Sequence, residues 1–119
     1  MNPRTSRLLA QGDVLLRKYT GPMPENPTIE AVDPRHGVVL AYGEATGSAH
    51  ALDPRGVRVL EATATTPRLL EIDAADVLGA AEAILRHIKH PPQSLPAKTV
   101  WEVVQQVEQI EGEIIRVAD

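Results

Sequence analysis

Three histidines are the side chains of this sequence best suited to chemistry: His50, His87 and His90. Imidazole is the commonest protein ligand of transition metals and the natural acid or base near neutral pH. His87 and His90 are separated by two residues. On a helix their rings would share a face and could bind one ion, whereas on an ideal strand they would point to opposite faces unless a bulge or the turn at Pro91 brought them together. The competing interpretation is that all three are ordinary surface or loop histidines.

A second group of polar side chains lies in the segment 43–50. If this segment is extended, one strand face carries a carboxylate, two hydroxyls and an imidazole, from Glu44, Thr46, Ser48 and His50. Glu44 would then act as a base or orient a histidine. The competing interpretation places the glycines of the segment at a bulge or sheet corner whose polar face is simply hydrated. The segment lacks the GxxxxGK[ST] pattern of a phosphate loop, and the histidine pair lacks the HExxH pattern of zinc proteases.

The composition limits the range of functions. A chain of 119 residues with 43% hydrophobic content supports one core, so we predict a single domain over residues 1–119. The absence of cysteine excludes disulfides, thiolate metal sites and cysteine nucleophiles, and it favours a cytoplasmic protein. The net charge of −4 does not support nucleic-acid binding, for which only a local basic patch near the start would serve. No apolar run is long enough to span a membrane, so no membrane association is expected.

Short apolar runs bounded by turn residues must position the histidines. We interpret Gln11-Gly12-Asp13 as a tight turn between two strands, and the prolines within 20–34 indicate a surface loop. Further strands are predicted over 36–44 with a continuation to 52, and over 57–62, 68–72 and 99–108, with a loop over 91–97. The pattern predicts a mainly β fold, as a single compact antiparallel β-sandwich or barrel-like domain.

The segment 72–90 is ambiguous between helix and strand. Its apolar residues follow the i, i+3, i+4 spacing of a helix, and Asp73-Ala74-Ala75-Asp76 could cap one, which favours a short helix around 74–88. Against a helix, Gly79 interrupts the pattern and the two prolines at 91–92 require His90 to be extended. Both assignments stay open.

The order of several motifs resembles a family of small bacterial and phage proteins without an established activity. The resemblance is carried by Gln11-Gly12-Asp13-Val14-Leu15-Leu16, Gly43-Glu44-Ala45-Thr46-Gly47-Ser48-Ala49-His50-Ala51, His87-Ile88-Lys89-His90 with Leu95-Pro96, and the ending Gln105-Gln106-Val107-Glu108 with Ile115-Arg116-Val117-Ala118-Asp119. These segments correspond in order to the family's "QGDV" start, "GE-TGHAH" centre, "H-E-H" pair and "QRE…RVxD" end. The resemblance implies a compact, mostly β domain in which the central and later histidines come together, and it favours strand in the later part of 72–90.

The chain departs from the family pattern at three places. Ser48 stands where the family has its first central histidine, Ile88 and Lys89 replace acidic residues, and Ala97 replaces a glycine. A site of three or four histidines would therefore be reduced to His50, His87 and His90.

Two functions fit these observations. The leading hypothesis is a noncatalytic binding or accessory scaffold module that assembles with itself or a protein partner, because no complete catalytic constellation is visible and a short chain barely covers its strand edges. The alternative is a histidine-dependent hydrolase, metal-assisted in one version, acting on phosphoester or nucleic-acid ends. Its catalytic candidates are Glu44, His50 and His87, and its metal ligands would be His50, His87 and His90. No cofactor is certain; a divalent transition metal is the one these histidines would bind. Whether the protein is an enzyme stays open.

Overall fold

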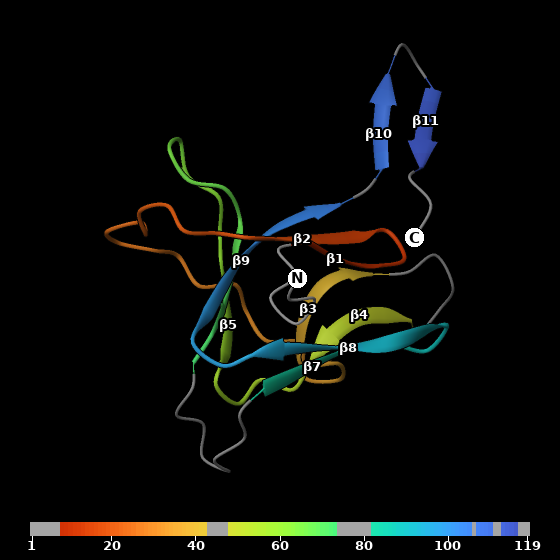
Figure 1. Ribbon diagram of the computed structural model, residues 1–119, viewed down its shortest axis with the longest axis horizontal. Coiled ribbons are helices and arrows are strands. Elements are labelled where there is room, and N and C mark those ends of the chain that lie inside the picture. The colour runs from red at the N-terminus through yellow and green to blue at the C-terminus, as the bar shows by residue number, and fades with distance from the viewer. Residues whose placement is uncertain (1–7, 43–47, 74–81, 106, 111–112, 117–119) are drawn as a thin grey trace, which may run out of the picture.

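The computed structural model describes residues 8–42, 48–73, 82–105, 107–110 and 113–116, and all regular structure in these ranges is β (Figure 1). The strands are β1 (Leu8–Gln11), β2 (Val14–Lys18), β3 (Val38–Tyr42), β4 (Ala49–Leu52), β5 (Val57–Leu60), β6 (Leu69–Ile72), β7 (Glu82–His87), β8 (His90–Pro96), β9 (Thr99–Gln105), β10 (Val107–Ile110) and β11 (Glu113–Arg116). The described residues contain no helix long and apolar enough to cross a membrane.

Two antiparallel sheets form the body of the protein. The first has the strand order β1-β2-β9-β6-β5 and the second has the order β3-β4-β7-β8, while β10 and β11 form a two-stranded sheet. The edges of the two sheets approach each other, because β1 contacts β8 and β3 contacts β5. The sheets nevertheless stay separate and do not close into a barrel. The predicted mainly β, sandwich-like fold is therefore confirmed.

The core lies between the sheets and is aliphatic, with one tryptophan at its centre. Trp101 on β9 is 1% exposed, and it packs with Leu16 of β2 and Leu70 of β6 in the same cluster. From the second sheet, Leu85 and Leu95 reach this cluster from β7 and β8. Alternating buried and exposed residues along β2 and β5 show the period of two that such burial produces.

The predicted short helix around 74–88 is wrong for its second half. Residues 82–87 form strand β7, which pairs with both β4 and β8, while 74–81 lie outside the described residues. The helix prediction was wrong because pairing with other strands overrides a local sequence pattern. Leu85 and Ile88 would lie on the same face of a helix, but in the structure Leu85 is buried and Ile88, in the turn, is 83% exposed.

The predicted loop over 91–97 is also wrong, because residues 90–96 form β8. Proline cannot donate to a ladder, which is why Pro91 and Pro92 argued against a strand. β8, however, lies at the edge of its sheet, and its register with β7 shifts between Leu85 and His87, opposite the two prolines. Edge strands and bulges are the places where a sheet accepts proline.

Candidate functional site

Three imidazoles come together where β1 of the first sheet meets the second sheet. The ring centroids of His50 and His87 lie 4.1 Å apart, those of His87 and His90 4.8 Å, and those of His50 and His90 5.7 Å. His50 lies on β4 and is 4% exposed, while the other two are half-buried. The sequence prediction left it open whether these rings would meet, and in the structure they do.

A hairpin turn brings His87 and His90 to one side. His87 ends β7, His90 begins β8, and the two are directly paired across the turn formed by Ile88 and Lys89. Residues paired across two strands point to the same face. On a continuous strand this spacing would place the two rings on opposite faces. The turn places them on the same face, which is the exception that the sequence analysis gave for a turn at Pro91.

Gln11 fixes the orientation of His50. The Gln11 side chain is 2% exposed, and its Nε2 donates to the backbone oxygens of Leu85 and Pro91, both at 2.9 Å. Because both acceptors are carbonyl oxygens, the amide nitrogen must face them and Oε1 must face His50. His50 Nδ1 lies 2.9 Å from Oε1, so Nδ1 carries the proton and donates it. The lone pair of the neutral ring is consequently on Nε2.

Gly12 allows the rings to lie against the β1–β2 turn. Its φ is +56°, and a Cβ at this position would come within 2.6 Å of His90 Nε2 and 2.9 Å of His50 Cε1. Glycine is therefore required here twice, by the backbone conformation and by the two rings. The predicted turn at Gln11-Gly12-Asp13 is confirmed, and it belongs to the site.

His87 has the opposite tautomer. Its Nδ1 accepts a hydrogen bond from the backbone N–H of Lys89 at 3.0 Å, so the proton of the neutral ring lies on Nε2. Burial lowers the pKa of His87, the charges of His90 and Lys89 lower it further, and Asp13 opposes the shift. A neutral imidazole that presents Nε2–H is a hydrogen-bond donor rather than a base.

These tautomers bear on metal binding. Among the described residues, no three His, Asp or Glu side chains are arranged to hold a metal ion. His50 and His87 are stacked at an angle of 25°, and their separation of 4.1 Å is shorter than the ~5 Å expected for two rings bound to one tetrahedral zinc. For His87 to bind a metal through Nε2, it would also have to give up the hydrogen bond from Lys89, since Nδ1 would carry the proton.

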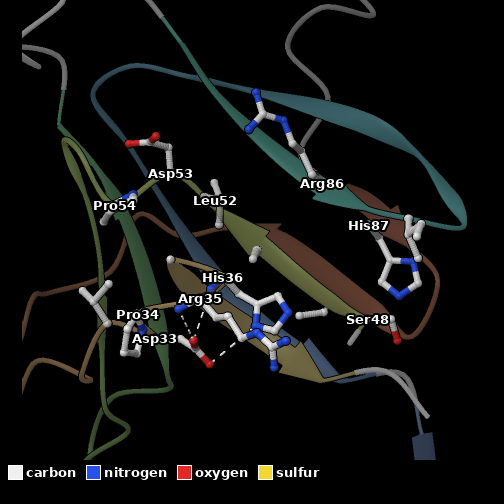
Figure 2. A pocket seen from close by; sticks show the side chains of 15 residues that line it. Asp33, Pro34, Arg35, His36, Ser48, Leu52, Asp53, Pro54, Arg86 and His87 are labelled. Carbon is white, nitrogen blue, oxygen red and sulfur yellow. Dashed lines mark hydrogen bonds and ion pairs between the residues drawn. The ribbon is translucent and has the colours of Figure 1, made fainter. Parts of the chain in front are cut away.

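A pocket of about 700 Å³ opens beside the histidine cluster (Figure 2). Fifteen residues line it: Val32, Asp33, Pro34, Arg35, His36, Gly37, Ser48, Ala49, Ala51, Leu52, Asp53, Pro54, Arg86, His87 and Ile88. Figure 2 shows Arg35, His36, Ser48 and His87 toward one end of the hollow, with Asp53 and Arg86 toward the other. His87 thus belongs both to the pocket wall and to the imidazole stack, whereas His50 and His90 do not line the pocket.

The two carboxylates of the pocket are engaged in their own turns. Asp33 accepts hydrogen bonds from the backbone N–H groups of Arg35 and His36 and from the Tyr42 hydroxyl, the last at 2.5 Å. The Tyr42 hydrogen bond contributes most to holding the pKa of Asp33 well below its usual range. Asp53 accepts from the guanidinium and the backbone N–H of Arg55, which lowers its pKa as well.

His36 is one of the pocket residues that no sequence motif indicated. Its Nδ1 lies 3.6 Å from Asp33 Oδ2, farther than a hydrogen bond, and its ring meets Tyr42 edge-on at 6.1 Å. A histidine three residues after an aspartate in a proline-rich loop carries no motif, so only the folded turn shows its position. Arg35 and Arg86 were also missed, because isolated arginines have no spacing to read.

The remaining predicted site residues have mixed outcomes. Ser48 is buried, and it lines the pocket. Glu44, a candidate catalytic base, lies outside the described residues, as does Thr46 of the predicted polar face.

Residues 10–106 match a protein-family model described as a domain of unknown function (DUF8820). The match includes all three clustered histidines and the whole lining of the pocket. Comparisons with curated proteins and with solved structures gave no match.

Proposed function

We propose that this chain, which belongs to the DUF8820 family, is a noncatalytic binding module that holds its ligand in the pocket beside His87. One observation carries the proposal: the Lys89 N–H that donates to His87 Nδ1 makes the imidazole at the pocket wall a donor. A donor can recognise a ligand, but it cannot take a proton from water.

The other described groups of the pocket do not supply a prepared base. The carboxylates of Asp33 and Asp53 already accept several hydrogen bonds each. His36 could take a proton, but its Nδ1 is not hydrogen-bonded to Asp33, and such a bond is what normally fixes the tautomer of a histidine base.

The imidazole stack behind His87 supports the wall of this pocket. Gln11 ties β1 to β7 and β8 through two backbone oxygens and holds His50 through a third hydrogen bond. His50 in turn stacks on His87. A ring packed in this way has few accessible rotamers, so His87 presents its donor with little entropy left to lose on binding.

The rival function is a histidine-dependent hydrolase, and one observation favours it. His36 and His87 line the same pocket, and the 3.6 Å separation between His36 and Asp33 could shorten when substrate binds, as catalytic hydrogen bonds often do. In a phosphoester reaction, His36 would take a proton from the attacking water and return it to the oxygen of the leaving group. A metal-assisted version would instead need His87 to change tautomer, and the rings of His50, His87 and His90 to tilt toward one ion.

Turnover separates the two functions. The full chain is incubated with bis(4-nitrophenyl) phosphate and with 4-nitrophenyl phosphate, alone and with zinc, manganese or nickel, and its own metal content is measured by elemental analysis. We expect no release of nitrophenolate above that of the buffer with the same metal. Turnover that disappears in His36→Asn or His87→Phe, while Arg58→Gln retains it, would overturn the binding proposal.

Assembly with a second copy or a protein partner in the cytoplasm remains a prediction of this proposal. The first step of its test is light scattering after size-exclusion chromatography, which reports a dimer or larger species if the chain self-assembles. A monomer would confine the prediction to a partner protein, which a pull-down from the native host would then have to recover.

A further inference from the structure

We propose that the end of the pocket formed by Arg35, Ser48 and His87 binds the oxyanion of a small ligand, a phosphate or a carboxylate group. The inference rests on the proposed function and adds the chemical class of the ligand. It depends on which hydrogen-bonding groups this end of the pocket offers.

This end of the pocket presents donors. His87 offers Nε2–H, because Nδ1 is occupied by the Lys89 N–H. Ser48 contributes a hydroxyl, which can donate or accept, and Arg35 contributes a guanidinium, which can only donate. An oxyanion accepts hydrogen bonds with every oxygen and is the ligand group that a set of donors fits.

Among the residues that the structure describes, no side chain pairs with the guanidinium of Arg35. The backbone N–H of Arg35, by contrast, reaches Asp33. Asp33 is the acidic residue nearest in the chain, and its two oxygens accept from Arg35 N–H, His36 N–H and the Tyr42 hydroxyl. The Asp33 carboxylate is therefore held within its turn, and no side chain of the described residues competes with a ligand for the Arg35 guanidinium.

The opposite end of the pocket also carries more positive than negative charge. Asp53 forms an ion pair with Arg55 at 3.0 Å, and the charge of Arg86 also lowers the pKa of Asp53. Two guanidinium groups thus act on one carboxylate that is already engaged. This arrangement disfavours a cationic ligand at Asp53. The Arg35 end is distinguished as the anion site by the additional donors of Ser48 and His87.

The pocket also has room and surface for an organic group attached to the anion. Its volume of about 700 Å³ falls within the range of small-molecule sites. Val32 and Ile88 line it and are 49% and 83% exposed, so each has apolar surface that a ligand could cover. Inorganic phosphate alone would leave this surface in water, which is why we infer an organic phosphate or carboxylate.

The test is a titration of the full chain followed by two-dimensional amide NMR. Inorganic phosphate and acetate serve as separate probes, and sodium chloride at equal ionic strength controls for general salt effects. We expect saturable shifts confined to the amides of Arg35, Ser48 and His87 with at least one probe. The probe that saturates at lower concentration identifies the ligand class as phosphate or carboxylate.

Two variants decide whether the site is the proposed one. Arg35→Gln should weaken binding about tenfold, which is the loss expected for one charged hydrogen bond. Arg58→Gln is the control, because Arg58 is also an exposed arginine, lies on β5, pairs with Glu71 and does not line this pocket. Binding in Arg35→Gln equal to that in Arg58→Gln, or shifts that never saturate, would overturn the inference. Either of these results, in the absence of phosphoester turnover, would reject the oxyanion site but not the proposed binding function. Turnover of phosphoesters would instead overturn the proposed binding function.

Discussion

Replacing Gln11 with methionine tests how the two sheets are joined at the histidine cluster. Methionine nearly matches glutamine in length but removes every polar contact of the side chain. The change leaves the backbone oxygens of Leu85 and Pro91 and the Nδ1–H of His50 without their present partner at a position that is 2% exposed. Three hydrogen bonds at about 1 kcal/mol each predict a loss of about 2–4 kcal/mol, with the upper end set by the cost of burying unsatisfied groups.

Urea unfolding followed by tryptophan fluorescence measures this loss, because Trp101 is the only tryptophan and lies in the core. A lower midpoint with an unchanged m-value would report a pure change in stability. Gln93→Met on β8 is the matched control, since the Gln93 side chain forms no hydrogen bond with another described residue and is only half-buried. We expect the control to lie within about 0.5 kcal/mol of the parent protein. A loss below about 1 kcal/mol for Gln11→Met would refute the proposed role of this amide.

Three further predictions concern the same region and the neighbouring turn. Gly12→Ala should destabilise the protein by about 1–3 kcal/mol and shift the NMR signals of His90 and His50, because φ is +56° and the new Cβ would meet both rings; unchanged ring signals would contradict this. Burial lowers the folded-state pKa of His87, so the unfolded chain binds the proton more tightly. The contribution of His87 to stability should therefore be constant above about pH 6.5 and fall as the pH is lowered below that value. His87→Gln should flatten the curve of urea midpoint against pH in this range, and an unchanged curve would contradict the prediction. Lys98→Gly should raise the stability by about 0.5–1 kcal/mol, because Lys98 has a φ of 62°, and a loss of stability would show that the lysine side chain matters more than the backbone strain.

The sequence was sufficient to predict the β fold and most of its strands. Apolar runs such as 57–62 and 99–108 are bounded by turn residues, and the structure has β5 and β9 within them. The turn at Gln11-Gly12-Asp13 was equally readable, because glycine and aspartate between two apolar runs have few other uses.

The segments around the second histidine pair could not be predicted because their structure depends on distant partners. Residues 82–87 have a helical pattern, but β4 and β8 make them a strand. Pro91 and Pro92 break most strands, yet the edge position and the register shift of β8 accept them. Local spacing contains no information about which strand will lie next to another.

Only part of the candidate site was predictable, because its geometry also depends on residues that are distant in the sequence. The sequence identified His50, His87 and His90 as candidates but could not show that their rings meet. In the structure, the β7–β8 turn brings them together. The role of Gln11 was not visible, because a buried amide 39 residues before its histidine partner leaves no pattern in the sequence. Arg35 and His36 join the pocket only because the loop at Asp33 turns back on itself through two backbone hydrogen bonds with Gly37.

The tautomer of His87 tests the central claim most directly. Long-range hydrogen–nitrogen NMR of the ¹⁵N-labelled chain at pH 7.5 distinguishes a protonated ring nitrogen from one with a lone pair. We predict that His87 carries its proton on Nε2 and accepts from Lys89 at Nδ1, while His50 carries its proton on Nδ1 facing Gln11. A proton on Nδ1 of His87, with the Nε2 lone pair directed into the pocket, would make this residue a base and would contradict the assignment of the chain as a binding module.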